Sequence, residues 1–278
     1  MNTPAQNSLQ PVTPQQHGAL RWKRFAAYTF AAEDAVVPLV AHEVSRAAMA
    51  LPLAFVKAPA KGGETAATTY VLMAVLGLGK GQNLFVAPDG RWLGSYIPSA
   101  YRGYPFQLAN TPDGQQVLCL RNGSGLVSDT EGDTGGERFF DDDGQPSQAV
   151  KEVLGFLTQV AQNRQVTQRI VALLAEKGLI QPWSIKTQSQ AGERAIEGLY
   201  RIDEAKLNEL SAEDLKALQT AGALPLAYAQ LLSMQHLQTL GKLAQARASQ
   251  PEVRPTTSTG ELDLEFLNKN GTISFGAM

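Results

Sequence analysis

The residues between 92 and 106 gather aromatic and arginine side chains that could bind a ligand. From Tyr96 to Phe106 the sequence has three tyrosines, one arginine and two prolines. Aromatic rings and a guanidinium group stack on nucleobases, sugars and peptides. Aromatic residues at strand ends also pack under loops and complete a core, so both roles stay open. The residues that we expect in a binding site are Trp92, Tyr96, Tyr101, Arg102 and Tyr104.

A second candidate site is the acidic stretch from Asp129 to Gly144. Carboxylates beside glycines can supply oxygen ligands to calcium or magnesium. The order of an EF-hand loop is broken, because the sixth position from Asp129 is Thr134 and the twelfth is Phe140. The acids also precede an expected helix, whose N-terminal end stabilises negative charge. The alternative to this structural role is a metal site at Asp141, Asp142 and Asp143, with Arg138 anchoring an anionic substrate.

Other reactive residues lack the partners that known motifs require. The glycine-rich stretch 77–81 has neither the spacing nor the Lys-Ser/Thr ending of a phosphate-binding loop. His42 begins a pattern like that of zinc proteases, but the second histidine is replaced by Arg46. Ser124 lies in Gly-Ser-Gly, which lacks the spacing of a nucleophile elbow. Cys119 lies in an apolar run, where we expect a buried thiol.

The first half of the chain has the pattern of an antiparallel sheet. Short runs rich in β-branched and aromatic residues alternate with turn residues. Two turns share the sequence Pro-Asp-Gly, at 88–90 and 112–114, and each should join neighbouring antiparallel strands. The pattern therefore predicts a β-meander. Its expected strands are 51–57, 70–78, 83–87, 91–97, 104–109 and 116–121.

The second half changes to the three- and four-residue spacing of helices. Ser147 and Gly178 bound the longest such stretch, and Asp203 is placed to cap a later helix. Helices that follow an antiparallel sheet predict the α+β class, with the meander packed against them. The expected elements are a long or kinked helix over 147–177, a hairpin over 183–187 and 194–202, and helices over 204–210, 211–222 and 225–247.

Several short motifs are more informative together than singly. They are Asn83-Leu84-Phe85-Val86, Asp89-Gly90-Arg91-Trp92, Tyr96-Ile97-Pro98, Tyr104-Pro105-Phe106, and the runs 137–144, 196–203 and 222–228. In order and spacing, over about residues 20–245, the sequence resembles the SapC family of bacterial proteins. The resemblance implies a link to a bacterial surface layer. It also implies that the protein acts alongside outer-membrane receptors, flavin halogenases and cupin-like oxygenases. It carries over no catalytic residue, and His42 and the long C-terminal extension depart from the family pattern.

Composition divides the chain into four parts. Residues 1–20 are rich in Pro and Gln and should form a disordered arm, before a SapC-like α+β domain over 21–247. Residues 248–260 resemble a flexible linker. Apolar residues alternate with acids over the last part, 261–278, and Asn270-Gly271 offers a turn, which predicts a small β-hairpin. An isolated hairpin is marginal, so this one should dock on the body, on another copy or on a partner.

Charge and hydropathy limit the possible functions and compartments. Hydrophobic residues make up 44% of the chain, which is enough for a packed core, and the net charge of −2 gives no field for nucleic-acid binding. No apolar run reaches the length of a membrane span, and no secretory signal is seen at the N-terminus. With its single cysteine, the chain fits a reducing compartment. We therefore expect a cytoplasmic protein by default, with export that needs no N-terminal signal as an open alternative.

These observations leave two hypotheses for function. The first is a non-catalytic binding or assembly protein that holds a protein, peptide or glycan, with a homo-oligomer as an open option. The second is a metal-dependent enzyme, or an enzyme accessory, in a modification pathway alongside halogenases or oxygenases. We favour the first, because candidates for general acid, base and nucleophile do not cluster in the sequence. No cofactor is expected.

Overall fold

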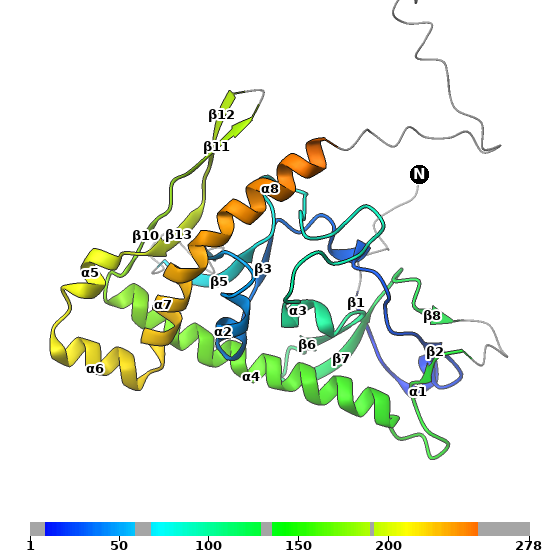
Figure 1. Ribbon diagram of the computed structural model, residues 1–278. Coiled ribbons are helices and arrows are strands. Elements are labelled where there is room, and N and C mark those ends of the chain that lie inside the picture. The colour runs from blue at the N-terminus through cyan, green and yellow to red at the C-terminus, as the bar shows by residue number, and fades with distance from the viewer. Residues whose placement is uncertain (1–8, 59–67, 129–134, 190–191, 250–278) are drawn as a thin grey trace, which may run out of the picture.

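The computed structural model describes residues 9–58, 68–128, 135–189 and 192–249, and the side chains of 187–194 are not described. Antiparallel sheets and a long helix are present, so the predicted α+β class is confirmed (Figure 1). The described helices are α1 (Pro14–His17), α2 (Val44–Ala47), α3 (Ser99–Arg102), α4 (Gln148–Glu176), α5 (Glu204–Asn208), α6 (Ala212–Thr220), α7 (Ala223–Ser233) and α8 (Leu237–Ala248), with 3₁₀ helices η2 (Thr29–Ala31), η3 (Ala41–Glu43) and η4 (Met234–His236).

The largest sheet has five antiparallel strands in the order β10-β13-β4-β5-β3. The residues Leu53, Ala54 and Phe55 of its central strand are all fully buried, because protein covers both faces. Helix α4 packs on β5, and α7 packs on β4 and β13 and also against α4. The five strands are β10 (Ile180–Pro182), β13 (Leu199–Ile202), β4 (Leu53–Lys57), β5 (Tyr70–Val75) and β3 (Val36–Pro38).

Two buried polar side chains of α7 hold this helix on the sheet. The Gln230 side chain donates to the carbonyl of Leu53 at 3.0 Å and accepts from the N–H of Ile202 at 2.9 Å. Ser233 Oγ accepts from the N–H of Leu53 at 2.9 Å. A buried backbone group without a partner costs stability, so these bonds fix the position of α7 over β4 and β13.

Three smaller sheets complete the fold, and two of them lie beside the first half of α4 (Figure 1). Their side chains form a second core, in which the rings of Trp22 and Phe106 meet edge to face at 4.7 Å. The sheets are β1-β7-β6 (Leu9–Pro11, Gln116–Arg121, Phe106–Asn110), β8-β2-β9 (Val127–Ser128, Arg21–Trp22, Glu137–Arg138) and the hairpin β11-β12 (Ile185–Ser189, Gly192–Ile196).

The first-half strands differ from the expected single meander. Strands β4 and β5 belong to the large sheet, whereas β6 and β7, joined by the predicted turn at 112–114, belong to a smaller one. The expected strands 83–87 and 91–97 are reduced to one bridge between Val86 and Trp92. The buried Asn83 side chain explains this, because it bonds to Phe85 N–H and to the carbonyl of Ala31 and so bends the chain away from regular pairing.

The long helix α4 follows the prediction closely. Ser147 caps it by accepting the N–H of Val150, and the helix stops before Gly178, which has a positive φ of 67°. Its first turns contribute to the second core through Val150, and its last turns to the main core through Ile170 and Leu174. One continuous helix therefore connects the two cores.

The N-terminal region and the later hairpin also differ from expectation. Residues 9–20, assigned above to the arm, include β1, which pairs with β7, and α1, which ends at the buried His17. The second arm of the expected hairpin divides at Gly198, so β12 pairs with β11 while β13 joins the large sheet. The expected linker and C-terminal hairpin lie beyond residue 249, outside the described residues. None of the described helices is both long and apolar enough to span a bilayer.

Candidate functional site

The predicted recognition segment crosses the middle of α4 between the two cores (Figure 1). Its short helix α3 lies close to α4 at Gly103, where a Cβ atom would come within 2.6 Å of Leu157 Cδ2. Glycine allows this close approach without a shift of the Leu157 side chain. The contact brings the side chains around α3 to the middle of α4, where Leu157 also packs on the second core.

Trp92 enters the site from a turn that is tied to the main core. Its indole N–H donates to the carbonyl of Tyr96 at 2.9 Å, and its ring stacks on Phe85 at 5.6 Å. The ring also meets Tyr101 edge to face. Because Trp92 is only partly exposed, its main contribution is to hold the following segment in place.

The next aromatic residues form a cluster with the N-terminal part of the chain. Tyr104 lies parallel to Phe30, with ring centroids 3.8 Å apart, and Tyr101 meets Phe30 edge to face. Phe25 adds a further edge contact to Tyr104. Two of the predicted binding residues, Tyr101 and Trp92, therefore contribute mainly to packing. Tyr104 presents only part of its ring to solvent.

The buried carboxylate of Glu43 anchors the segment to η3. Its two oxygens accept four hydrogen bonds between 2.7 and 3.0 Å, from Val40 N–H, Ser99 N–H, Ser99 Oγ–H and Tyr96 Oη–H. Its side chain is 6% exposed, and Arg102 approaches it at 3.5 Å. A buried carboxylate is tolerated only with such partners, so Glu43 fixes the start of α3.

Arg102 lies at the surface end of this network. Its guanidinium donates to Tyr96 Oη at 2.7 Å and lies over the rings of Tyr96 and Phe156 at 5.5 and 5.8 Å. Burial and the neighbouring Glu43 raise the pKa of Tyr96, so its hydroxyl stays protonated and donates to Glu43. The side chain of Arg102 is 42% exposed, which leaves its other N–H groups available.

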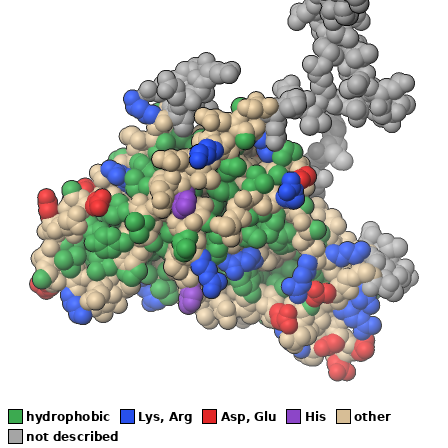
Figure 2. All heavy atoms as spheres, viewed as in Figure 1, with side chains coloured by type: hydrophobic (Ala, Val, Ile, Leu, Met, Phe, Trp, Pro, Cys, Tyr) green, Lys and Arg blue, Asp and Glu red, His purple; other side chains and the backbone are tan. Residues whose placement is uncertain are grey.

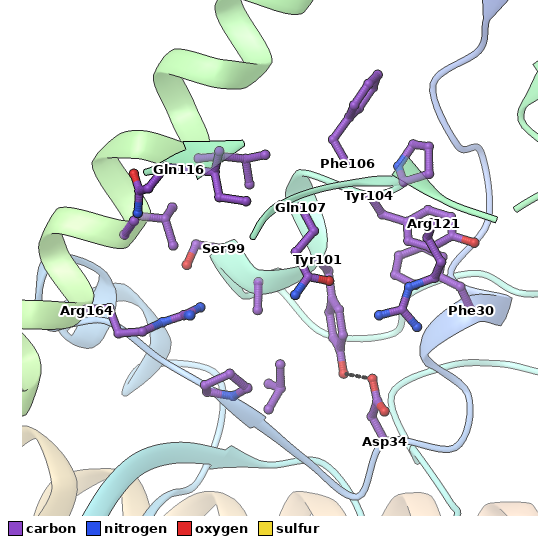
Figure 3. A pocket seen from close by; sticks show the side chains of 18 of the residues that line it. Phe30, Asp34, Ser99, Tyr101, Tyr104, Phe106, Gln107, Gln116, Arg121 and Arg164 are labelled. Carbon is purple, nitrogen blue, oxygen red and sulfur yellow. Dashed lines mark hydrogen bonds between the residues drawn. The ribbon is translucent and has the colours of Figure 1, made fainter. Parts of the chain in front are cut away.

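A cavity of about 370 Å³ opens beside the segment, between α3, α4 and the β6–β7 hairpin (Figure 3). Arg164 points into it from α4 and Arg121 from the opposite side, with Gln107 between them in this view. The stacked rings of Phe30 and Tyr104 form part of its wall. Polar groups that converge on a partly apolar cavity of this size are typical of ligand sites.

The floor of this cavity contains a carboxylate–phenol pair. Tyr101 Oη donates to Asp34 Oδ2 at 3.0 Å (Figure 3). Although Asp34 retains solvent contact, burial of its carboxyl raises its pKa, while the Tyr101 hydrogen bond and Arg121 act in the opposite direction. Burial and the charge of Asp34 raise the pKa of Tyr101, so the phenol remains a donor. The pair presents a carboxylate oxygen toward any ligand amide or ammonium group.

A second cavity of about 620 Å³ lies on the other side of α3. Ser99 of α3 and Val160 of α4 line both cavities, so the contact between α3 and α4 separates the two. Tyr96, Arg102 and Glu43 line this second cavity, whereas Tyr101 and Tyr104 line the first. The predicted binding residues thus lie in one segment that borders two cavities.

Of the acidic stretch, residues 135–144 are described, and Asp129, Glu131 and Asp133 lie outside the described residues. Asp141, Asp142 and Asp143 are exposed, and Asp142 Oδ1 accepts from Arg138 at 2.6 Å. Acidic and basic side chains gather at the end of the molecule where α4 begins (Figure 2). In the described ranges, no three His, Cys, Asp or Glu side chains come together as metal ligands. The acids precede Ser147, the N-cap of α4, which is the position that a structural role at the start of this helix requires.

The remaining candidates are separated in space from this network, apart from one. Cys119 is a buried free thiol in β7, and burial raises its pKa, as the sequence predicted. His236 bonds to the carbonyl of Ala48, and Ser124 accepts from the N–H of Leu126 in a turn. His42 is the exception, because it lines the second cavity.

Sequence reasoning missed the charged residues that complete the site. They lie outside the aromatic segment, and the fold brings them together over α4. The only local sign of these residues in the sequence was Glu43, because a carboxylate in an apolar run needs a partner. The residues concerned are Asp34, Glu43, Arg46, Arg121 and Arg164.

Comparison with known proteins identifies the family. The family model described as SapC matches residues 12–240, which is more than half of the chain and starts before the expected domain boundary at residue 21. No curated protein and no solved structure matches the chain. The matched range contains both cavities and the whole of α4. The chain belongs to the SapC family.

Proposed function

We propose that this protein is a non-catalytic binding protein that holds a segment of a protein or peptide partner in the cavity beside Tyr101 and Tyr104. The observation that carries the proposal is the convergence of Arg121, Arg164 and Gln107 on a cavity with an aromatic wall. Its volume of about 370 Å³ suits one or two residues of a peptide.

The polar groups of the cavity match those of a peptide. Gln107, Asn110 and Gln116 carry amide side chains, which both donate and accept and so suit a peptide backbone. The side chain of Arg164 makes no hydrogen bond or ion pair with any residue in the described part of the chain, and its guanidinium suits an acidic side chain or a terminal carboxylate. The stacked Phe30 and Tyr104 offer an apolar surface for a side chain of the partner.

The absence of a shared reaction centre supports a role in binding rather than in catalysis. The Asp34 carboxylate is bonded to Tyr101, and the Glu43 carboxylate is surrounded by donors. The exposed acids near α4 lie apart from both cavities, because neither cavity is lined by them. Burial and Asp34 raise the pKa of Tyr101, which keeps its phenol in the protonated, weakly nucleophilic form.

An array experiment tests the proposal. Fluorescently labelled protein is applied to defined immobilised peptides and glycans, and every hit is then titrated in solution by fluorescence anisotropy. We expect peptide hits with acidic residues, and a loss of about tenfold or more in affinity on Arg164→Gln, because a charge-assisted hydrogen bond is removed. Arg169→Gln is the matched control, since Arg169 is exposed on the same helix and lines neither cavity.

The outcomes separate the parts of the proposal. Peptide hits that weaken on Arg164→Gln but not on Arg169→Gln support it. Glycan hits with the same sensitivity would keep the cavity and replace the class of partner. An array without hits, or hits that both variants bind equally well, would overturn the assignment of this cavity.

A further inference from the structure

The second cavity has a different chemistry from the first, because arginine side chains dominate its charge. It is an open groove of about 620 Å³ between η3 and α2 on one side and α3 and α4 on the other. Its charged lining residues are Glu43, Arg46 and Arg102, so two guanidinium groups face one carboxylate. Its other polar lining residues are His42, Ser45, Tyr96, Ser99, Gln159 and Asn163.

The carboxylate of Glu43 forms one ion pair with Arg102, at 3.5 Å, and its shorter contacts go to other residues. Its four hydrogen bonds go to Val40, Ser99 and Tyr96, which fills the four lone-pair positions of a carboxylate. Its side chain is 6% exposed, whereas that of Arg102 is 42% exposed. The negative charge is therefore buried below the groove, and N–H donors form the surface that a ligand would meet.

Arg102 is held in position before any ligand arrives. The rings of Tyr96 and Phe156 both contact its guanidinium, and Tyr96 Oη accepts one of its N–H groups. Fixing a guanidinium in this way lowers the entropy cost of binding a further partner. The remaining N–H groups of Arg102 keep the planar fork that matches two oxygens of an anion.

Further donors lie on the opposite wall. Arg46, Ser45 and His42 are exposed, and their side chains make no hydrogen bond or ion pair with any residue in the described part of the chain. With Arg46 and Arg102 opposed by Glu43 alone, the groove keeps an excess of one positive charge. That excess favours an anionic ligand over a neutral or cationic one.

We propose that this groove is an oxyanion-binding site, in which Arg46 and Arg102 hold a carboxylate, phosphate or sulfate group. The three anions share the chemistry that the groove recognises, which is a pair of oxygens facing a guanidinium fork. The site is independent of the peptide cavity, since its arginines do not line that cavity. A ligand long enough to pass Ser99 and Val160 would occupy both.

Titration of the full chain with simple anions tests the site. Sodium phosphate, sulfate and acetate are added separately while sodium chloride holds the ionic strength constant, and binding is followed by two-dimensional amide NMR. We expect saturable shifts in residues 42–46 and 99–102 with at least one of the three anions. Comparison of the three affinities shows which oxyanion the groove prefers.

Three variants test whether the anion binds at Arg46 and Arg102. Arg46→Gln should weaken binding of the preferred anion by about tenfold, because it removes a charged donor. It should fold normally, because the exposed side chain of Arg46 makes no hydrogen bond or ion pair among the described residues. Arg102→Lys keeps the charge but loses the fork, so it should also weaken binding. Arg169→Gln again serves as the control and should bind like the natural protein.

Three results would overturn the proposal. One is a response that sodium chloride alone reproduces, which would mean general screening. Another is a set of shifts that lies away from both 42–46 and 99–102. The third is equal anion affinity in Arg46→Gln and Arg169→Gln. None of these depends on the peptide array, so failure here and failure of the proposed function can be told apart.

Discussion

Ser99 donates two hydrogen bonds to the carboxylate of Glu43, one from its backbone N–H and one from its hydroxyl, each at 2.7 Å. The two residues are 56 positions apart in the sequence, so this double contact fixes α3 relative to η3. Both cavities are lined by Ser99. The shape of the whole site therefore depends on one buried carboxylate.

Replacing that carboxylate by an amide should destabilise the fold. In Glu43→Gln one oxygen becomes an NH₂ group that faces the donors of Ser99 or Val40. We expect a loss of about 3 kcal/mol in the free energy of unfolding, measured by urea denaturation. Glu33→Gln, at an exposed residue, should change it by less than about 0.5 kcal/mol. Equal stability of the two variants would show that the Glu43 network contributes little.

Trp92 should be a folding residue. Trp92→Ala removes the stack on Phe85 and the bond to Tyr96, and we expect a loss of about 3 kcal/mol in the free energy of unfolding. Trp92→Phe keeps a ring and loses only the indole N–H, so it should cost about 1 kcal/mol. A Trp92→Ala protein of normal stability that has lost peptide binding would instead place this residue on the recognition surface.

His17 should make stability fall in mild acid. It is 3% exposed against Phe139, and burial lowers its pKa below the ordinary value of 6.5. The unfolded chain therefore binds a proton more readily than the native protein between that native pKa and 6.5, so stability rises with pH through this window and is lost as pH falls through it.

The variant His17→Phe removes this titration. Its free energy of unfolding should vary less than that of the natural protein between about pH 5 and pH 7, when both are measured by urea denaturation. His42→Gln removes an exposed histidine and is measured beside it for comparison. An unchanged pH profile in His17→Phe would assign the dependence to other groups.

The body should fold without the C-terminal extension. The described residues of the two cores and α8 all lie before residue 250, so deletion of 250–278 should leave the urea midpoint unchanged. Size-exclusion chromatography with light scattering then compares the oligomeric state with that of the full chain. The predicted docking hairpin implies a change in that state or in partner binding. Insolubility of the shortened chain would mean that the extension belongs to the core.

Sequence patterns predicted the elements whose stability is local. The cap at Ser147, the apolar spacing through Leu174 and the stop at Gly178 all lie within one helix, and α4 matches the prediction to within a residue at each end. Asp203 likewise caps α5 through Lys206 N–H. Such features depend on neighbours three or four residues away, which the sequence contains directly.

Features set by distant contacts were less accessible to sequence reasoning. The bending of the chain at Asn83 depends on Ala31, and the position of α3 depends on Glu43. The aromatic segment could be chosen from composition alone, but Arg164 joins it only because α4 passes beneath α3. Binding by that segment remains our proposal, whereas its position between two cavities is a result of the fold.

Helix α4 has no fully buried residue between Val150 and Thr167, although it is well packed at both ends. At a rise of about 1.5 Å per residue, this is a span of about 25 Å in which the apolar side chains that pack on the second core, Val153, Leu154 and Leu157, are only partly buried. Both cavities border this span. A molecule bound in the first cavity would cover more of Leu157, which lines it, and would so add packing to the stretch of helix that joins the two cores.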